Sequence, residues 1–291
     1  RLAQLYATEN EIDRSREAYY RAIAIQERML AESPDNLDFK ATLANTLVNL
    51  SSVLDLDSQP DDPVSLIHRS IELRRQVIAK FPDDAGHRGE LALCLDELSS
   101  RLWDKGERDE AERLCREAFD IHRKIFVDVP DADSQYYLAR SYSHMASLLA
   151  ATCRVRAAFV NYQQAIILNQ QLADGFPNAP EHRKNLAENQ FHVAQLLWKA
   201  DWDAPENATD PIDPDVVRRA ASGGQVKRST FLSGLPIIVP HDVAGRRRLA
   251  ESAYRQAITL EDGLRAEFPK DPQYALAADR ARVAHGLLLW E

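Results

Sequence analysis

The side chains with the clearest potential for metal chemistry are two histidines and a glutamate. Glu188 lies four residues before His192, so both side chains project from one face of a helix, and His144 stands at the equivalent position one sequence repeat earlier. Imidazole and carboxylate groups are common zinc ligands, and a site needs three or four of them. No third ligand is apparent for the histidine pair, so we expect solvent-facing histidines and no bound metal.

Motifs for nucleophilic, phosphoryl-transfer or metalloprotease chemistry are missing from the sequence. It contains no P-loop, no Gly-x-Ser-x-Gly and no His-Glu-x-x-His. The phrase His87-Arg88-Gly89 begins like a kinase catalytic loop but lacks the Asp that accepts the hydroxyl proton. Paired carboxylates such as Asp83-Asp84 lie in turns, where Asp caps the next helix. We therefore predict a protein that is not an enzyme and uses no cofactor.

Composition narrows the class of protein further. The chain has 291 residues, of which 45% are hydrophobic and 28% charged, as in soluble globular proteins. Only 10 residues are glycine, which argues against Gly-rich phosphate loops and β-rich folds. The net charge of -9 opposes attraction to nucleic acid or anionic lipid, and no apolar run is long enough to span a membrane. Three widely spaced cysteines indicate no disulfide framework, so we expect a cytoplasmic location.

A proline recurs along the chain at nearly constant spacing. Its copies are Pro34, Pro82, Pro130, Pro177 and Pro269, at intervals of 48, 48, 47 and 92 residues. Proline lacks an amide hydrogen and restricts the residue before it, so each copy is expected to end a helix. The turn after Pro130 is one residue shorter than the others. The last interval is close to two periods, which indicates an insertion within one repeat.

Two helical patterns alternate between these prolines. After each proline, apolar residues spaced by seven and four positions mark a helix that we name helix A, as in Leu91, Leu98 and Leu102. Before each proline, a small residue, a larger one and a second small one mark helix B, as in Ala111 and Ala118. These spacings place the pattern residues on one face of each helix, with small residues where a neighbouring helix approaches closely.

These patterns resemble the tetratricopeptide repeat. The clearest copy consists of Leu98, Ser99, Leu102, Gly106, Ala111, Cys115 and Ala118. The family's repeat has 34 residues, so each helix here is longer by about two turns. The resemblance covers residues 1–202 and 247–291 and implies an all-α, right-handed solenoid of antiparallel helix pairs with one long irregular insertion. Repeats of this length are similar to those of kinesin light chains and, more closely, to arrays fused to bacterial serine/threonine kinases.

The repeat pattern divides the chain into six segments. We expect a partial first repeat (1–34), three complete repeats (35–82, 83–130 and 131–177), a repeat with an insertion at about 203–246 (178–269), and a last helix A (270–291). Because Arg1 and Glu291 both fall inside helical patterns, we expect the natural chain to extend further.

The insertion at 203–246 has three interpretations. Its density of proline and glycine argues against a long helix, and it is acidic in its first part and basic in its later part. It is a mobile surface loop, or a strap whose run Leu235–Pro240 packs across the groove, or a carrier of kinase sites at Ser222 and Ser229. The sequence favours the loop over the other two.

Arrays of this family generally hold extended peptides against their A helices. The resemblance implies a partner-binding groove lined by residues between the helix A core positions and by tryptophans near the helix ends. These residues are Asn45, Asn49, Asp96, Trp103, Arg140, His144, Glu188, Phe191, His192 and Trp198. Trp103 and Trp198 have an alternative role in packing against helix B. The Lys, Asn and Arg clamp by which some family members bind chaperone tails is missing, so that ligand does not transfer.

We therefore expect a non-catalytic scaffold that binds a partner protein or peptide in this groove. The alternative is a regulatory or docking region of a larger signalling enzyme, most plausibly a bacterial-type serine/threonine kinase whose catalytic domain lies outside this segment. The sequence indicates no oligomeric state.

Overall fold

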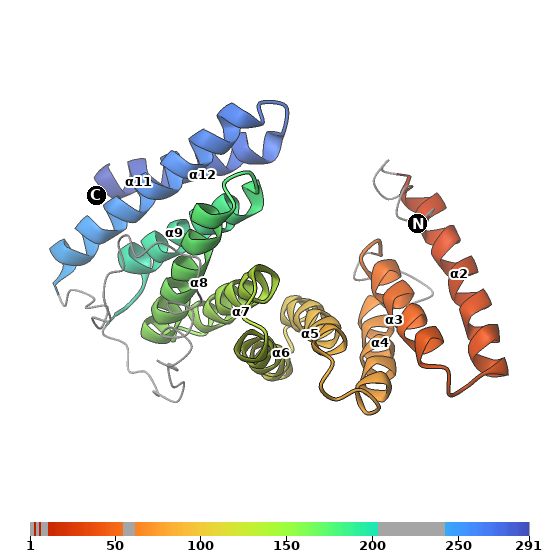
Figure 1. The fold of residues 1–291 in the computed structure, drawn as a ribbon. Coiled ribbons are helices and arrows are strands. Elements are labelled where there is room, and N and C mark those ends of the chain that lie inside the picture. The colour runs from red at the N-terminus through yellow and green to blue at the C-terminus, as the bar shows by residue number, and fades with distance from the viewer. Residues whose placement is uncertain (1–2, 4–5, 7–10, 55–61, 203–241, 291) are drawn as a thin grey trace. The chain divides into compact units, whose positions relative to one another are not determined.

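The computed structural model describes residues 3, 6, 11–54, 62–202 and 242–290, and every regular element in these ranges is an α-helix (Figure 1). The A helices are α3 (Leu37–Ser51), α5 (Ala85–Asp104), α7 (Ala132–Ala151), α9 (Pro180–Lys199) and α12 (Pro272–Trp290). The B helices are α2 (Ile12–Glu32), α4 (Pro63–Ile78), α6 (Arg108–Asp128), α8 (Val155–Gly175) and α11 (Val243–Glu267). The predicted all-α fold of alternating A and B helices is confirmed.

The chain forms two compact units, residues 1–125 and 126–291. In unit 1, α3 packs against α2 and α4, and α4 packs against α5. In unit 2, α8 packs against α7 and α9, and α11 packs against α9 and α12. Within each unit these helices therefore lie against their neighbours in sequence, as in a stacked helical repeat. None of the described helices is long and apolar enough to cross a membrane.

The pattern residues of helices α3, α5, α7 and α9 form the core. Leu43, Leu98 and Leu138 have no exposed surface at all. In the last helix, α12, the pattern residues Leu276, Val283 and Leu287 are exposed and Ala278, Ala281 and Leu288 are buried instead, so the pattern predicted after Pro269 is wrong. At the small positions the helices approach closely, and Ser70 uses this proximity to donate a 2.9 Å hydrogen bond from its hydroxyl to the carbonyl of Ala44 on α3. A larger side chain there would overpack the contact between the two helices.

The proline turns end each helix B and start the next helix A. Two residues after Pro82, Asp84 accepts a hydrogen bond from the amide of His87 and caps α5. In the turn after Pro130, which lacks one residue, Asp131 directly follows the proline and caps α7 in a reciprocal pair with Ser134. The shorter turn therefore keeps the cap that satisfies the first amides of the helix.

Aromatic side chains bridge several of these turns. In each case the residue before the proline contacts a ring six positions later, in the first turn of the next helix. The pairs are Phe81 with His87, Phe176 with His182, and Phe268 with Tyr274, with ring centroids 6.0, 6.1 and 5.7 Å apart. These contacts resemble the hydrophobic staple that fixes the direction in which a chain enters a helix.

The two described turns from helix A to helix B each contain one residue with positive φ. Gly106, the loop glycine of the family pattern, has φ of 86° between α5 and α6. Between α7 and α8 the residue with positive φ is Cys153, whose φ is 60°. A side chain in this left-handed region costs about 1–2 kcal/mol relative to glycine, so Cys153 stores strain that Gly106 avoids.

The insertion is shorter at its C-terminal end than the sequence predicted. Helix α11 begins at Val243, and Asp242 caps it by accepting a 2.6 Å hydrogen bond from the amide of Gly245. The helix thus starts three residues before Arg246, the approximate end predicted for the insertion, because the capping residue Asp242 lies upstream. The remainder of the insertion, with the expected strap and kinase sites, lies outside the described residues.

Candidate functional site

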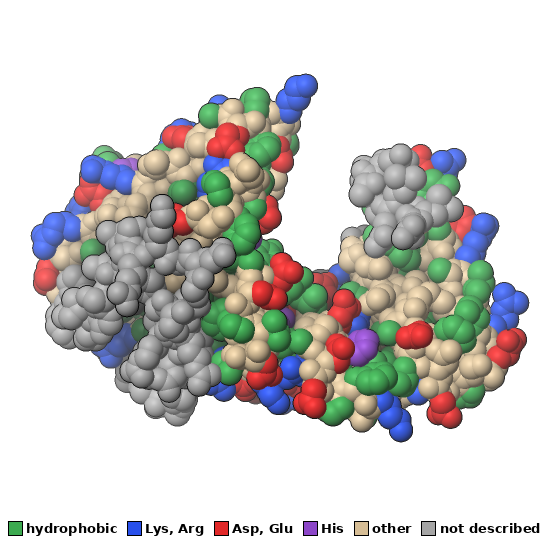
Figure 2. Space-filling model, in the orientation of Figure 1, with side chains coloured by type: hydrophobic (Ala, Val, Ile, Leu, Met, Phe, Trp, Pro, Cys, Tyr) green, Lys and Arg blue, Asp and Glu red, His purple; other side chains and the backbone are tan. Residues whose placement is uncertain are grey.

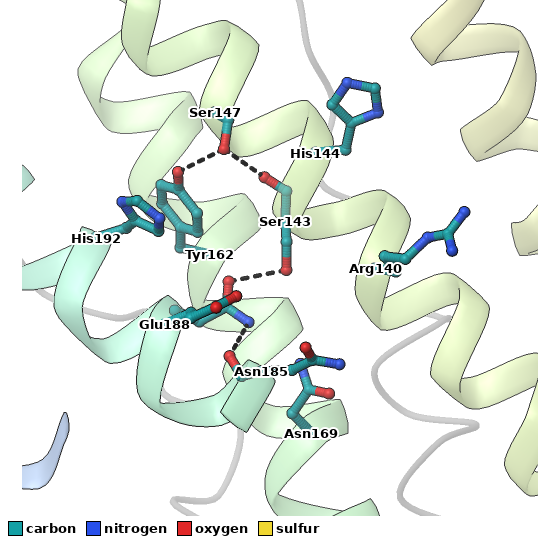
Figure 3. A pocket seen from close by; sticks show the side chains of 10 residues that line it. Arg140, Ser143, His144, Ser147, Tyr162, Asn169, Asn185, Glu188 and His192 are labelled. Atoms are coloured by element: carbon teal, nitrogen blue, oxygen red, sulfur yellow. Dashed lines mark hydrogen bonds between the residues drawn. The ribbon is translucent and has the colours of Figure 1, made fainter. Parts of the chain in front are cut away.

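Four of the predicted groove residues meet in one pocket of unit 2. Arg140 and His144 reach it from α7, and Glu188 and His192 reach it from α9 (Figure 3). The other lining residues are Ser143, Ser147, Tyr162, Asn169, Asn185 and Asn189. The pocket has a volume of about 200 Å³. This is below the ~300–1,000 Å³ typical of sites for drug-sized molecules, so it suits a single side chain or a short stretch of backbone.

A chain of hydrogen bonds holds the pocket wall together (Figure 3). The amide of Asn189 donates to the carbonyl of Asn185 at 2.8 Å and accepts from the hydroxyl of Ser143 at 2.8 Å. Ser147 donates to the carbonyl of Ser143 at 3.1 Å, and its oxygen lies 2.8 Å from the hydroxyl of Tyr162. The chain joins α7, α8 and α9, so these polar groups are preorganised before any ligand arrives.

Two rings form an uncharged part of the wall. Tyr162 and His192 stack with centroids 5.4 Å apart and planes inclined by 15°. Burial raises the pKa of Tyr162 to about 12, so its hydroxyl stays neutral. Burial and the positive charge of Arg280 lower the pKa of His192, which favours the neutral imidazole at pH 7. His192 is therefore half-buried against a tyrosine, and the expectation that it faces solvent is wrong.

The floor of the pocket contains an amide oxygen that the chain does not satisfy. Asn169 on α8 is only 1% exposed, and its Oδ1 has no hydrogen-bond partner among the described residues. Leaving such a group unpaired costs about 1–3 kcal/mol. Glu188 lies beside it, half-buried, and forms no ion pair within the described part of the chain. Both groups are acceptors that a ligand with hydrogen-bond donors would satisfy.

The positive group of the pocket, Arg140, lies on its opposite side. The guanidinium of Arg140 lies over the ring of Tyr137, with its Cζ 5.7 Å from the ring centroid. In Figure 3, Arg140 and His144 project away from Glu188 and Asn169. The pocket thus has a basic rim on α7 and an acceptor-rich side on α8 and α9.

Asn169 occupies a position that is polar in every helix B. Eight residues before each recurring proline stands a buried or half-buried polar side chain, which we call the floor position. The floor residues are Gln26, Arg74, His122, Asn169 and Glu261. The apolar pattern alone does not indicate this position, although a polar residue at a fixed distance from each proline is visible in the sequence.

Two predicted groove residues are not available to a partner. Asp96 is 6% exposed and Phe191 is 5% exposed. The ring of Phe191 packs edge-on against Tyr254 at 5.7 Å, and the guanidinium of Arg280 covers it at 4.5 Å. Their place in the groove was therefore predicted wrongly, because neighbouring side chains of the stacked repeats cover these positions.

Of the remaining predicted residues, Asn45, Trp103 and Trp198 make internal contacts. In unit 1, Asn45 accepts a hydrogen bond from the guanidinium of Arg74, and Asn49 is half-buried. Trp103 packs against the core of unit 1. In unit 2, Trp198 lies edge-on to Tyr254 at 6.4 Å. Both tryptophans therefore take up the packing role that the sequence left open.

Three cysteines lie outside the pocket. Burial raises the pKa of the Cys94 thiol and raises that of Cys115 well above its usual value, so neither is a reactive thiolate. Cys153 is exposed, in the turn after α7.

Comparison with known proteins locates the family signal in one helix pair. Residues 91–131, which include most of α5 and all of α6, match the tetratricopeptide repeat family. This match supports a tetratricopeptide repeat protein, as the sequence pattern predicted. None of the curated protein sequences matches the chain.

Several solved structures are similar to this chain at low sequence identity. The human IFIT1 dimer with m7Gppp-AAAA is 17% identical, with a TM-score of 0.45 over 92% of this chain and 43% of the IFIT1 chain. BtubC from P. vanneervenii is 14% identical, with a TM-score of 0.44 over 94% of this chain and 92% of its own. TTC0263, a thermophilic TPR protein of Thermus thermophilus, is 18% identical, with a TM-score of 0.39 over 97% and 96%. The chain spans less than half the length of the IFIT1 chains, and likenesses at this level do not indicate what it binds.

Proposed function

We propose that this protein is an interaction module that binds an extended segment of a partner protein against its A helices, with the pocket of unit 2 as the principal contact. The observation that carries the proposal is the unpaired Oδ1 of Asn169 at the floor of a preorganised polar pocket. Amides and hydroxyls such as those of Ser143, Asn185 and Asn189 both donate and accept hydrogen bonds, which suits a peptide backbone.

The charge of the protein supports a peptide over a nucleic acid. Acidic and basic side chains are interspersed on the face seen in Figure 2, and the net charge is -9. Proteins gain most of their affinity for a phosphate backbone from clustered lysine and arginine side chains, and the face in Figure 2 shows no such cluster. Specificity therefore comes from the local groups of the pocket, and the chemistry is binding without catalysis.

A random linear peptide display library tests the proposal. Peptides selected on the whole chain are synthesised and their binding sites mapped with p-benzoylphenylalanine placed at His144, on the pocket rim, or at Arg255, an exposed position of α11. We expect photo-cross-links from position 144 and none from position 255. Equal cross-linking from both positions, displacement of the peptides by a short single-stranded RNA, or failure to select any peptide would contradict the proposal.

A further inference from the structure

The pocket exists because the floor residue of its repeat is short. In the repeat of α3 and α4 the floor residue is Arg74, which is 6% exposed and fills the corresponding space with its own side chain. The guanidinium of Arg74 donates to Oδ1 of Asn45 on α3 and forms an ion pair of 2.7 Å with Glu90 on α5. One repeat of this chain therefore encloses a cation at the floor position, between two successive A helices.

The same register places different residues around Asn169. Asn45 stands two positions after Leu43, the first core leucine of α3, and the same position on α7 is Arg140. Glu90 stands one position before Leu91, the first core leucine of α5, and the same position on α9 is Asn185. The set Asn45, Arg74 and Glu90 thus corresponds to Arg140, Asn169 and Asn185. The floor position of this repeat carries no arginine, and the space remains as the pocket.

We infer that the pocket is a subsite for a basic side chain, lysine or arginine, of the bound peptide. Its ammonium or guanidinium group would lie where the guanidinium of Arg74 lies in the other repeat. Donors of that group can reach Oδ1 of Asn169 on the floor, which has no partner among the described residues, and the carboxylate of Glu188 on α9. This inference rests on the proposed function, since it names the residue that the same pocket recognises.

The charges around the pocket favour a cation on this side. Arg140 opposes it, but its guanidinium is held over Tyr137 and projects away from Glu188 (Figure 3). Behind Glu188, the floor residue of the next repeat is Glu261, a second carboxyl group that is 3% exposed and electrostatically coupled to Glu188. Arg280 and Lys184 offset part of this negative charge. The ionised form of Glu261, whose pKa is about 7, would strengthen attraction to a bound cation.

The chain supplies its own blocking variant. Asn169→Arg restores at this floor position the residue that the α3–α4 repeat already accommodates, so its side chain should occupy the subsite from within. Peptides from the display selection are measured by calorimetry against the unaltered protein, Asn169→Arg, Glu188→Gln and a matched control, Glu181→Gln, which lies on α9 outside the pocket. Circular dichroism and hydrogen exchange report whether each variant keeps its helices.

We expect the selected peptides to share a lysine or arginine, and replacement of that residue by norleucine to weaken binding at least ten-fold. Glu188→Gln should weaken binding by a similar factor and Asn169→Arg should abolish it, while Glu181→Gln has no effect. If Asn169→Arg does not fold, the norleucine and Glu188→Gln measurements decide alone. Peptides that cross-link from position 144 but tolerate norleucine would overturn the basic subsite and leave the proposed function standing. Failure to select any peptide would overturn both.

Discussion

Glu261 is a buried carboxyl group that should make unit 2 less stable as the pH rises. Its side chain lies between helices that bring Glu188 and Lys184 from α9 and Arg280 and Tyr274 from α12. Burial, followed by the negative charge of Glu188, raises the pKa of Glu261 to about 7 from an ordinary value of 4.5. Desolvation therefore outweighs the favourable charges of Arg280 and Lys184.

The sign and size of the effect follow from proton linkage. The folded state holds a proton on Glu261 up to about pH 7, whereas the unfolded chain releases it near pH 4.5. The stabilisation from that proton is fully present below pH 4.5 and is lost as the pH rises through about 7. Since one pKa unit corresponds to about 1.4 kcal/mol, ionised Glu261 costs up to about 3 kcal/mol at pH 8. Glu261→Gln removes the titration while keeping the shape of the side chain.

We therefore expect Glu261→Gln to leave stability nearly unchanged at pH 4 and to raise the free energy of unfolding by up to about 3 kcal/mol at pH 8. Urea unfolding followed by hydrogen exchange of peptides from α11 measures unit 2 separately from unit 1. The control is Glu251→Gln on the same helix, which removes only an exposed i,i+4 pair with Arg255 and should cost under about 0.5 kcal/mol. A difference between Glu261→Gln and the unaltered protein that is the same at both pH values would refute the reasoning.

Four further substitutions test how the repeats are held together. Cys153→Gly should raise the free energy of unfolding by about 1 kcal/mol, because glycine accepts the positive φ at no steric cost, and Gly106→Ala should lower it; thermal unfolding of both variants checks the opposite signs. Leu98→Ala should cost about 2–5 kcal/mol, since the side chain is fully buried in unit 1, and a loss under about 1 kcal/mol in urea unfolding would contradict this packing. Ser70→Ala should cost about 1 kcal/mol through loss of the hydrogen bond to Ala44, and slower exchange in α4 than in the unaltered protein would argue against that bond.

Periodic features of the chain could be predicted from the sequence because they depend on neighbours a few residues away. The leucines of α3, α5, α7 and α9, the proline turns and the positive φ of Gly106 all follow from local spacing and backbone preference. The shortened turn after Pro130 also keeps its helix cap, since Asp131 stands directly after the proline. These features determine the fold class without any knowledge of how helices from different repeats meet.

The site depended on contacts that the spacing does not specify. Phe191 on α9 and Ser143 on α7 occupy equivalent positions of their repeats, and Ser143 lines the pocket. The ring of Phe191, in contrast, is covered by Tyr254 and Arg280, two residues that follow the long insertion in the sequence. Arg140, His144, Glu188 and His192 line one pocket, which also needs Asn169 from a helix B. Whether a helix A residue is exposed to a partner or covered depends on the lengths of the side chains in the next repeat. The pattern of core positions does not determine those side chains.

The floor position shows how such repeats vary without losing their fold. The apolar and small positions stay fixed from copy to copy because they fill the space between helices at native packing density. The residue eight positions before the proline lies between A helices that differ from repeat to repeat, so it can change in both length and charge. Arg74 is long enough to reach Asn45 and Glu90 and leaves no room for a ligand, whereas Asn169 is short and leaves its own oxygen unpaired. Where Asn169 replaces Arg74, and Arg140 and Asn185 replace Asn45 and Glu90, a pocket therefore stands in place of the internal ion pair, while the leucines that hold the helices together keep their positions.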